Sequence, residues 1–240
     1  MKSRPKIFVL IGSYSLVLSF FLLILFAGNR IITVYSEQKP LASVKTIVID
    51  AGHGGEDGGA STAAGTRESE INLQIALKLN DLMNLLGMNT KMIRQTDISV
   101  ATGGNTIAQR KVSDLKERVR IINETKNSTL ISIHQNYYSD TRYSGTQIFY
   151  APTQGSKECA EIMQKEIREF LQPNNHRQIK KADGIFVMQH IKCPGILIEC
   201  GFLSNPEEAR NLTKEDYQNK ICCIISSTVS KYLFDYKDIA

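Results

Sequence analysis

The sequence predicts an α/β fold: a single domain in which a mixed, mainly parallel β-sheet of about six strands is flanked by helices on both faces. Short apolar, β-branched runs alternate along the chain with longer segments whose apolar residues recur at helical spacing. A glycine-rich turn at 52–55 follows the first of these runs, at the strand end where open α/β sheets bind ligands. The apolar share, 42% of 240 residues, suffices for one core of ordinary size.

The N-terminal segment is predicted to be one transmembrane helix that precedes this domain. Residues 7–28 carry no formal charge, and at about 1.5 Å per residue they span a hydrocarbon core of roughly 30 Å. Lys2, Arg4 and Lys6 precede the segment, which favours a cytoplasmic N-terminus and an extracytoplasmic domain. A cleaved signal peptide is the alternative, but its apolar region is usually only about 7–15 residues.

These considerations divide the chain into four parts and make it a membrane-anchored protein of the extracytoplasmic face. The parts are a cytoplasmic N-terminus at 1–6, a transmembrane anchor or uncleaved signal at 7–28, a linker at 29–43 and the folded domain at 44–240.

Charge and cysteine usage argue against two classes of protein. The net charge of +5 is mild, and no block of Lys and Arg is interleaved with aromatic residues, so we expect no nucleic-acid partner. The five cysteines are odd in number and lack CxxC spacing, so we expect neither a zinc finger nor a structural disulfide. Cys222 and Cys223 lie in an apolar helical run and are expected in the core.

Hydrophobic periodicity places the individual elements in order along the chain. The helices are expected to begin near polar or acidic residues, and Gly87 is expected to end the first of them. Strands are predicted at 47–50, 88–94, 129–133, 145–150, 184–188 and 194–198, helices at 68–86, about 113–126, 156–171 and about 214–234, and loops at 96–107 and 173–181.

Four polar residues stand where such a sheet binds a ligand. His53 follows the first strand, His134 follows the third and Glu199 ends the last, while Glu68 begins the helix after the glycine-rich turn. Two imidazoles and one carboxylate are a common ligand set of catalytic zinc, with water in the fourth position. Three apolar residues precede Glu199, and the resulting burial should raise its pKa toward neutrality, where a general base works best, unless a nearby metal lowers it.

Other carboxylates compete with Glu68 for a place in this set. Glu56 and Asp57 lie so close to His53 in sequence that only a tight turn would bring them to the same metal ion. Glu70 lies two positions beyond Glu68, which points it elsewhere on a helix. An exposed His53 in an ordinary glycine-rich turn is the non-functional alternative.

Further histidines and basic residues have simple surface interpretations. His176 lies in a loop rich in Pro and Asn, and His190, which follows a predicted strand, either lines the cleft or, as we favour, lies on the surface. The remaining charges are expected on a solvated face: Arg118, Arg120, Lys180 and Lys181.

Four blocks of residues, in this order, resemble those of one protein family. They are Asp50-Ala51-Gly52-His53-Gly54-Gly55, Glu68-Ser69-Glu70-Ile71-Asn72-Leu73, Ser132-Ile133-His134-Gln135-Asn136 and Glu199-Cys200-Gly201-Phe202-Leu203-Ser204-Asn205. On these blocks the chain, over roughly 45–235, resembles the zinc-dependent N-acetylmuramoyl-L-alanine amidases. Its length, its single anchor and the segment 106–115 are similar to sporulation-specific spore-cortex amidases of the CwlD type. Cys200 stands where many relatives carry Thr, and we expect its side chain in the core.

The resemblance implies a site and a reaction. It implies that His53, Glu68 and His134 hold Zn²⁺ and that Glu199 is the catalytic carboxylate. The substrate would be peptidoglycan, cut at the amide bond between N-acetylmuramic acid and L-alanine. A cortex amidase would act in spore-cortex synthesis, where the peptide-free product leads to muramic-δ-lactam, needed for germination. By the same resemblance the protein would lie at the forespore membrane and work with a lipoprotein partner.

Two other functions share parts of this pattern. A catalytically weak, membrane-anchored scaffold that binds peptidoglycan through an amidase fold is the alternative from a different class, and the intact set of four residues argues against it. A zinc carboxypeptidase or a polysaccharide deacetylase would use similar metal chemistry but fits the order of the blocks poorly.

Overall fold

The computed structural model describes residues 45–235. The predicted cytoplasmic N-terminus, membrane anchor and linker all fall outside these residues. Within the described range, every helix is too short or too polar to cross a membrane.

Strands and helices alternate along the described chain, as the hydrophobic pattern predicts. The elements are β1 (Thr46–Ala51), α2 (Glu68–Leu85), β2 (Asn89–Met92), α3 (Ile107–Glu124), β3 (Ser128–Asn136), β4 (Gln147–Tyr150), α4 (Ser156–Phe170), β5 (Lys180–Lys181), α5 (Phe186–His190), β6 (Gly195–Phe202), α6 (Pro206–Leu212) and α7 (Glu215–Asp235).

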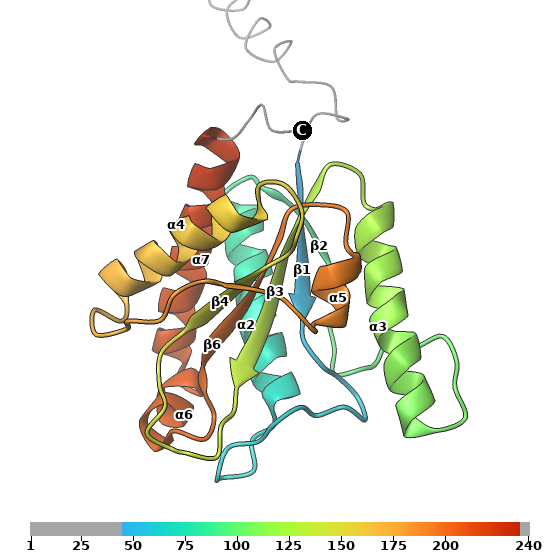
Figure 1. The fold of residues 1–240 in the computed structure, drawn as a ribbon, viewed down its shortest axis with the longest axis horizontal. Helices are drawn as coiled ribbons and strands as arrows, with labels where there is room; N and C mark the ends of the chain where they lie inside the picture. Colours follow the sequence, from blue (N-terminus) through green and yellow to red (C-terminus); the bar gives the residue numbers. More distant parts are fainter. Residues whose placement is uncertain (1–44, 236–240) are drawn as a thin grey trace, which may run out of the picture. The chain divides into compact units, whose positions relative to one another are not determined.

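The strands form one six-stranded sheet in the order β2-β1-β3-β6-β4-β5. β2, β1, β3 and β6 run parallel, whereas β4 pairs antiparallel with β6 and parallel with β5. The prediction of a mixed, mainly parallel sheet of about six strands is therefore confirmed. Because β1, β3 and β6 are parallel neighbours, their carboxyl ends lie together at one edge (Figure 1).

Helices cover both faces of the sheet, so its central strands are apolar on both sides. On one face Ile47 and Ile49 of β1 pack with residues of α2, α4 and α7. On the other face Val48 packs with Ile122 of α3 and Met188 of α5. Figure 1 shows α3 and α5 on one side of the sheet and α2, α4 and α7 on the other, which confirms the predicted three-layer arrangement.

One predicted element and one predicted boundary were wrong, and two short elements were missed. The strand expected at 184–188 is a turn followed by the short helix α5, because Gly184 adopts φ 83° and reverses the chain. Helix α3 begins six residues before the predicted 113, at a capping box in which Thr106 accepts from the backbone of Gln109 and the Gln109 side chain accepts from the backbone of Thr106. Two short elements, β5 and α6, were not predicted at all.

Cysteine placement was predicted in part. All five cysteines are free, and Cys200 and Cys222 are buried in the core as expected. Cys223, also expected in the core, is exposed, because successive residues of a helix point in different directions.

Candidate active site

The sequence-predicted site residues meet at the carboxyl ends of β1, β3 and β6. Ile133 of β3 pairs with Ala51, the last residue of β1, so His134 lies just beyond that pair. His134 is in turn the register partner of Glu199 on β6. Glu68, the first residue of α2, approaches from the glycine-rich turn that follows β1. Strand register therefore brings together residues far apart in sequence.

Two imidazoles and one carboxylate converge within this site. Oε1 of Glu68 lies 3.2 Å from Nε2 of His53 and 3.1 Å from Nδ1 of His134. The two rings meet edge to face with their centroids 5.0 Å apart. One ligand-type atom from each of the three residues lies within 4.8 Å of the others, a separation suited to one shared metal ion.

The charges of these groups favour an anionic carboxylate between the two rings. Burial opposes ionisation of Glu68, but its hydrogen bonds and charge interactions with His134 and His53 outweigh burial and hold its pKa far below the ordinary value. Burial likewise opposes protonation of His53, yet Glu68 and Asp57 together raise its pKa. In the metal-free protein the Glu68 carboxylate is therefore negatively charged, and this charge favours binding of a cation between the two rings.

Backbone and amide groups hold the Glu68 carboxylate in place. Oε2 accepts a hydrogen bond from the backbone of Ala60 at 3.0 Å. Oε1 accepts from the backbone of Gln135 at 3.1 Å and from the side chain of Asn72 at 3.3 Å. Such outer contacts fix the direction in which a ligating oxygen points.

Gly52 makes room for the ring of His134. A Cβ at Gly52 would lie 2.2 Å from atoms of the His134 ring, so this position tolerates no side chain. His53 itself has φ 61°, an uncommon conformation for a residue with a side chain. The turn therefore places both rings, one by the absence of a side chain and one by an unusual backbone.

Glu199 lies across from His134 with its carboxyl group largely withdrawn from water. Its Oε2 is buried without a hydrogen-bond partner among the described residues. Burial raises the pKa of Glu199 to about 7, although the nearby imidazoles of His134 and His53 oppose the shift. The direction expected from the apolar strand before Glu199 is confirmed, and a carboxyl group poised near neutrality suits proton transfer.

Two buried arginines hold the turn that carries His53. Arg118 donates to the carbonyl oxygens of His53 at 2.6 Å and Ala51 at 3.0 Å. Arg94 donates to the carbonyl oxygens of Ala51 at 2.8 Å and Gly52 at 3.0 Å. Three successive carbonyl groups thus face guanidinium donors.

The prediction that Arg118 lies on a solvated face was wrong, because its side chain is only 3% exposed. It pairs with Asp50 at 2.5 Å and with Asp114 at 2.6 Å. Asp50 also accepts a hydrogen bond from Ser132 at 2.7 Å. Burial opposes ionisation of Asp50, but the Arg118 charge, with smaller help from His134 and Ser132, lowers its pKa overall. The burial of Arg118 could not be predicted from its helix alone, because it depends on the ion pair with Asp50 of a distant strand.

The competing carboxylates lie outside the three-residue cluster. Glu56 pairs with Arg110 at 2.6 Å, and Glu70 pairs with Arg67 at 2.8 Å. Asp57 has a different place: its Oδ2 lies 3.0 Å from Nδ1 of His53, the ring nitrogen that faces away from Glu68.

The remaining charged residues have the surface positions expected of them. His190 turns its Nδ1 toward the carbonyl of Phe186 at 2.7 Å and is exposed. His176, Arg120, Lys180 and Lys181 are exposed as well.

A cleft of about 330 Å³ opens beside His53 and His134. Its lining also includes Phe186 from the 184–187 segment and Lys111 of α3, which contacts Asp57 at 3.0 Å. Sequence reasoning assigned no role to Lys111 or Phe186. The only signal for Lys111 was its place in the 106–115 segment, and Phe186 was taken for a strand residue.

Comparison with known proteins gives one consistent result. A family model described as N-acetylmuramoyl-L-alanine amidase matches residues 47–231. The chain is 37% identical over 198 residues to the germination-specific N-acetylmuramoyl-L-alanine amidase of Bacillus subtilis (strain 168), with 82% of this chain and 83% of the relative covered.

Solved structures agree with the sequence relatives. The CwlD amidase from Clostridioides difficile, solved in complex with the GerS lipoprotein, matches with a TM-score of 0.76 and 39% identity, over 80% of this chain and 99% of that one. An N-acetylmuramoyl-L-alanine amidase from Clostridium difficile 630 matches with a TM-score of 0.71 and 29% identity, over 81% and 99% of the two chains. The chain therefore belongs to the N-acetylmuramoyl-L-alanine amidase family and is an enzyme of that class, as its four sequence blocks predict.

Proposed function

We propose that this protein is a zinc amidase that cuts the bond between N-acetylmuramic acid and L-alanine in peptidoglycan. In this proposal His53, Glu68 and His134 hold the metal ion and Glu199 is the catalytic carboxylate. One observation carries it: ligand atoms of three residues converge within 4.8 Å at the sheet edge where Glu199 lies opposite His134.

The donor set fits zinc. Two imidazole nitrogens and one carboxylate oxygen are a ligand set of catalytic zinc sites, which leave a position open for water or substrate. The two rings are each about 20% exposed, so the site is reachable from the cleft, whereas Glu68 is buried behind them. Zinc, when bound, supplies Lewis-acid chemistry that polarises a carbonyl group and makes water a better nucleophile.

Glu199 moves the protons of the reaction. Its carboxylate accepts a proton from the attacking water and then delivers it to the leaving amine nitrogen of L-alanine. The buried, unpartnered Oε2 is the oxygen suited to this transfer, since no described side chain competes for it.

We further propose a role in spore-cortex synthesis. This proposal is supported by the relative whose name marks it as germination-specific and by the structural match to CwlD. The product would be peptide-free muramic acid, the precursor of muramic-δ-lactam. A membrane anchor at 7–28, an extracytoplasmic location at the forespore membrane and a lipoprotein partner complete the proposal, and the partner is suggested by the GerS lipoprotein bound to that CwlD.

Muropeptide mass spectrometry tests the reaction directly. The chain is loaded with zinc, its metal content is measured, and it is incubated with purified glycan-peptide strands. We expect about one zinc per chain, release of peptides with a free L-alanine amino group, and glycan without peptide. Intact strands retained on the protein would instead indicate the binding scaffold, and cleavage within the peptide or loss of acetate would indicate a carboxypeptidase or a deacetylase.

A further inference from the structure

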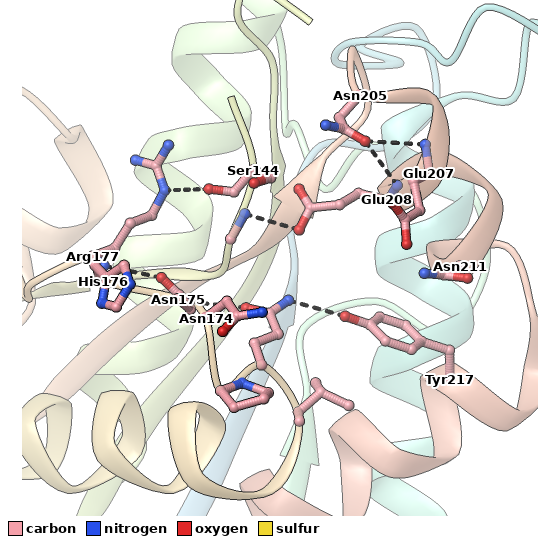
Figure 2. Close-up of a pocket in the computed structure, with 14 residues that line it drawn as sticks. Ser144, Asn174, Asn175, His176, Arg177, Asn205, Glu207, Glu208, Asn211 and Tyr217 are labelled. Carbon is pink, nitrogen blue, oxygen red and sulfur yellow. Dashed lines mark hydrogen bonds between the residues drawn. The ribbon is translucent and has the colours of Figure 1, made fainter. Parts of the chain in front are cut away.

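A second, larger cavity lies at the same end of the sheet as the candidate active site. Its volume is about 550 Å³, and its walls come from the loop before β4, the 171–177 segment after α4, helix α6 and the start of α7. Figure 2 shows His176 and Arg177 on one side of this cavity and Asn205, Glu207, Glu208 and Asn211 on the other. None of these residues belongs to the metal cluster or to the cleft beside it.

Gln147 links a residue of the cavity wall to the strand neighbour of the candidate general base. Gln147 of β4 is the antiparallel partner of Glu199, so the two side chains are neighbours on one face of the sheet. Nη1 of Arg177, in the cavity wall, donates to Oε1 of Gln147 at 3.3 Å. From the other wall, Glu208 accepts a hydrogen bond from the backbone of Phe202, three residues beyond Glu199, at 2.8 Å. These two hydrogen bonds connect the cavity walls with the strand residues around Glu199.

The cavity is held open by hydrogen bonds of its own lining. Asn175 donates to the carbonyl oxygen of Thr146 at 2.9 Å, and Gln172 accepts from the Thr146 backbone at 2.8 Å. Gln172 also donates to the hydroxyl of Tyr217 at 3.0 Å (Figure 2). Because these side chains are already ordered, a ligand that enters the cavity does not have to order the loop.

The groups that remain free to meet a ligand are largely uncharged. Asn174 is exposed, and its side chain has no hydrogen bond within the described part of the chain. The amide of Asn211 faces the cavity with only a 3.5 Å contact from Lys214 to its oxygen. Burial raises the pKa of Tyr217 to about 12, so its hydroxyl keeps a proton to donate. Amides and hydroxyls of this kind both donate and accept hydrogen bonds.

The charges in the cavity disfavour an anionic ligand. Glu207 and Glu208 both line it, and the only Arg or Lys among its lining residues is Arg177. The guanidinium of Arg177 is already engaged: Nε donates to the carbonyl of Ser144 at 2.7 Å, and the group lies 4.5 Å from the ring centre of Phe202. The exposed carboxylate of Glu207 would repel a carboxylate-bearing peptide, whereas an uncharged ligand would meet no such repulsion.

We propose that this cavity binds an uncharged N-acetylhexosamine unit of the glycan strand, next to the muramic acid whose amide bond is cut. The proposal rests on the proposed function, because a glycan is relevant only if the substrate is peptidoglycan. Hydroxyl and acetamido groups match the free amides and the Tyr217 hydroxyl, and an uncharged sugar avoids the repulsion that a carboxylate would meet.

Binding of an uncharged saccharide to an inactive protein tests this proposal. The full-length Glu199→Gln variant is titrated with triacetylchitotriose by calorimetry and NMR. We expect saturable binding, and we expect the added double substitution Asn174→Ala and Asn211→Ala to weaken it about tenfold, because two hydrogen-bonding amides are lost. Asn219→Ala, an exposed amide of α7 outside the cavity, is the matched control and should leave the affinity unchanged.

A kinetic comparison in the active protein gives a second readout. The double variant should raise KM for long glycan-peptide strands at unchanged kcat, and should leave both constants unchanged for a single muramoyl peptide. Absence of saccharide binding, equal affinity in the double variant and the control, or binding of a free acidic stem peptide in place of the saccharide would overturn the proposal. Since the titration needs no turnover, a failure of amide hydrolysis would count against the proposed function alone.

Discussion

The two candidate ligand histidines are held in the same site by different means. His134 lies within β3, in a ladder of backbone hydrogen bonds with β6. His53 lies beyond the end of β1 with φ 61°, a conformation that costs on the order of 1–3 kcal/mol. The charged hydrogen bond from Arg118 to the His53 carbonyl is worth about 1.5–3 kcal/mol and offsets that cost. A strand supports its ligand locally, whereas the turn depends on distant side chains.

The distant side chains also connect the ligand-bearing segments with one another. Arg94 joins the turn at Gly52 to the carbonyl of Ser69 in the first turn of α2, next to Glu68. Asp50, paired with Arg118, joins β1 to Ser132 of β3, two residues before His134. We therefore expect the position of His53 to be more sensitive than that of His134 to substitutions away from the metal site.

Removal of either imidazole ring should have the largest effect on zinc binding. The effect should be similar for His53 and His134, although the two residues are supported differently. His53→Ala and His134→Ala each delete a donor of the three-residue cluster. We therefore expect zinc affinity to fall by more than the tenfold to hundredfold that is typical when a residue contacting a ligand is replaced. Metal analysis after dialysis against a weak chelator measures the effect. His190→Ala is the control, since this exposed ring lies outside the cluster. Retention of stoichiometric zinc in either site variant would contradict the ligand assignment.

Loss of the carboxylate opposite His134 should separate metal binding from turnover. Glu199→Gln keeps the shape of the side chain but cannot accept a proton, so we expect kcat to fall about 10²–10⁴-fold with zinc content unchanged. Metal analysis and turnover of glycan-peptide strands are measured on the same sample. If the variant loses zinc as well, Glu199 is a zinc ligand and its assignment as general base is wrong.

Substitution of Arg118 should break the support of the turn. Arg118→Met leaves Asp50 buried without its cation, so the free energy of unfolding should fall by about 3–5 kcal/mol, and the His53 turn should bind zinc more weakly. Denaturant unfolding with and without zinc measures both effects. Arg120→Met, on the exposed side of the same helix, should change neither. A variant that is less stable but keeps the original zinc affinity would show that the turn carrying His53 does not depend on Arg118 for its conformation.

Of the two candidate ligand histidines, Asp57 should influence only His53. Its Oδ2 lies 3.0 Å from the ring nitrogen of His53 that faces away from Glu68, so Asp57→Asn should weaken zinc binding about tenfold to hundredfold. Glu70→Gln, another half-exposed carboxylate near the site, is the control. Competition with a chromogenic chelator gives the dissociation constants. Equal zinc affinities in the two variants would contradict a role for Asp57 in supporting His53.

The smallest effect concerns pH in the metal-free protein. Because the folded-state pKa of Asp50 lies below its ordinary value of 3.8, its stabilising contribution is complete above that value and is lost as the pH falls through the folded-state pKa. Asp50→Asn should therefore flatten the acid limb of the stability curve, and Asp81→Asn, on the exposed side of α2, should not. Urea unfolding between pH 2 and 5 measures the slope. An unchanged slope in Asp50→Asn would contradict the ion pair with Arg118.

The sequence by itself determined the α/β class, most of the elements and the four residues that meet at the sheet edge. Apolar periodicity is a local property, and α2 illustrates it: Ile71, Ile75 and Leu79 follow helical spacing and are fully buried. Parallel strands carry their last residues to a common edge, so His134 and Glu199 were predictable neighbours once the strands were located.

Only the tertiary structure decided how those residues are supported. Arg118 has the sequence context of a surface residue, and its burial depends on Asp50, 68 positions away in the chain. The apolar residues at 185–188 suit a strand or a buried helix equally, and the left-handed turn at Gly184 selects the helix. The hydrophobic pattern of a helix or strand depends only on residues close together in sequence, so it can be read from the sequence. Buried charges are stabilised by partners that only the folded chain brings within hydrogen-bonding distance.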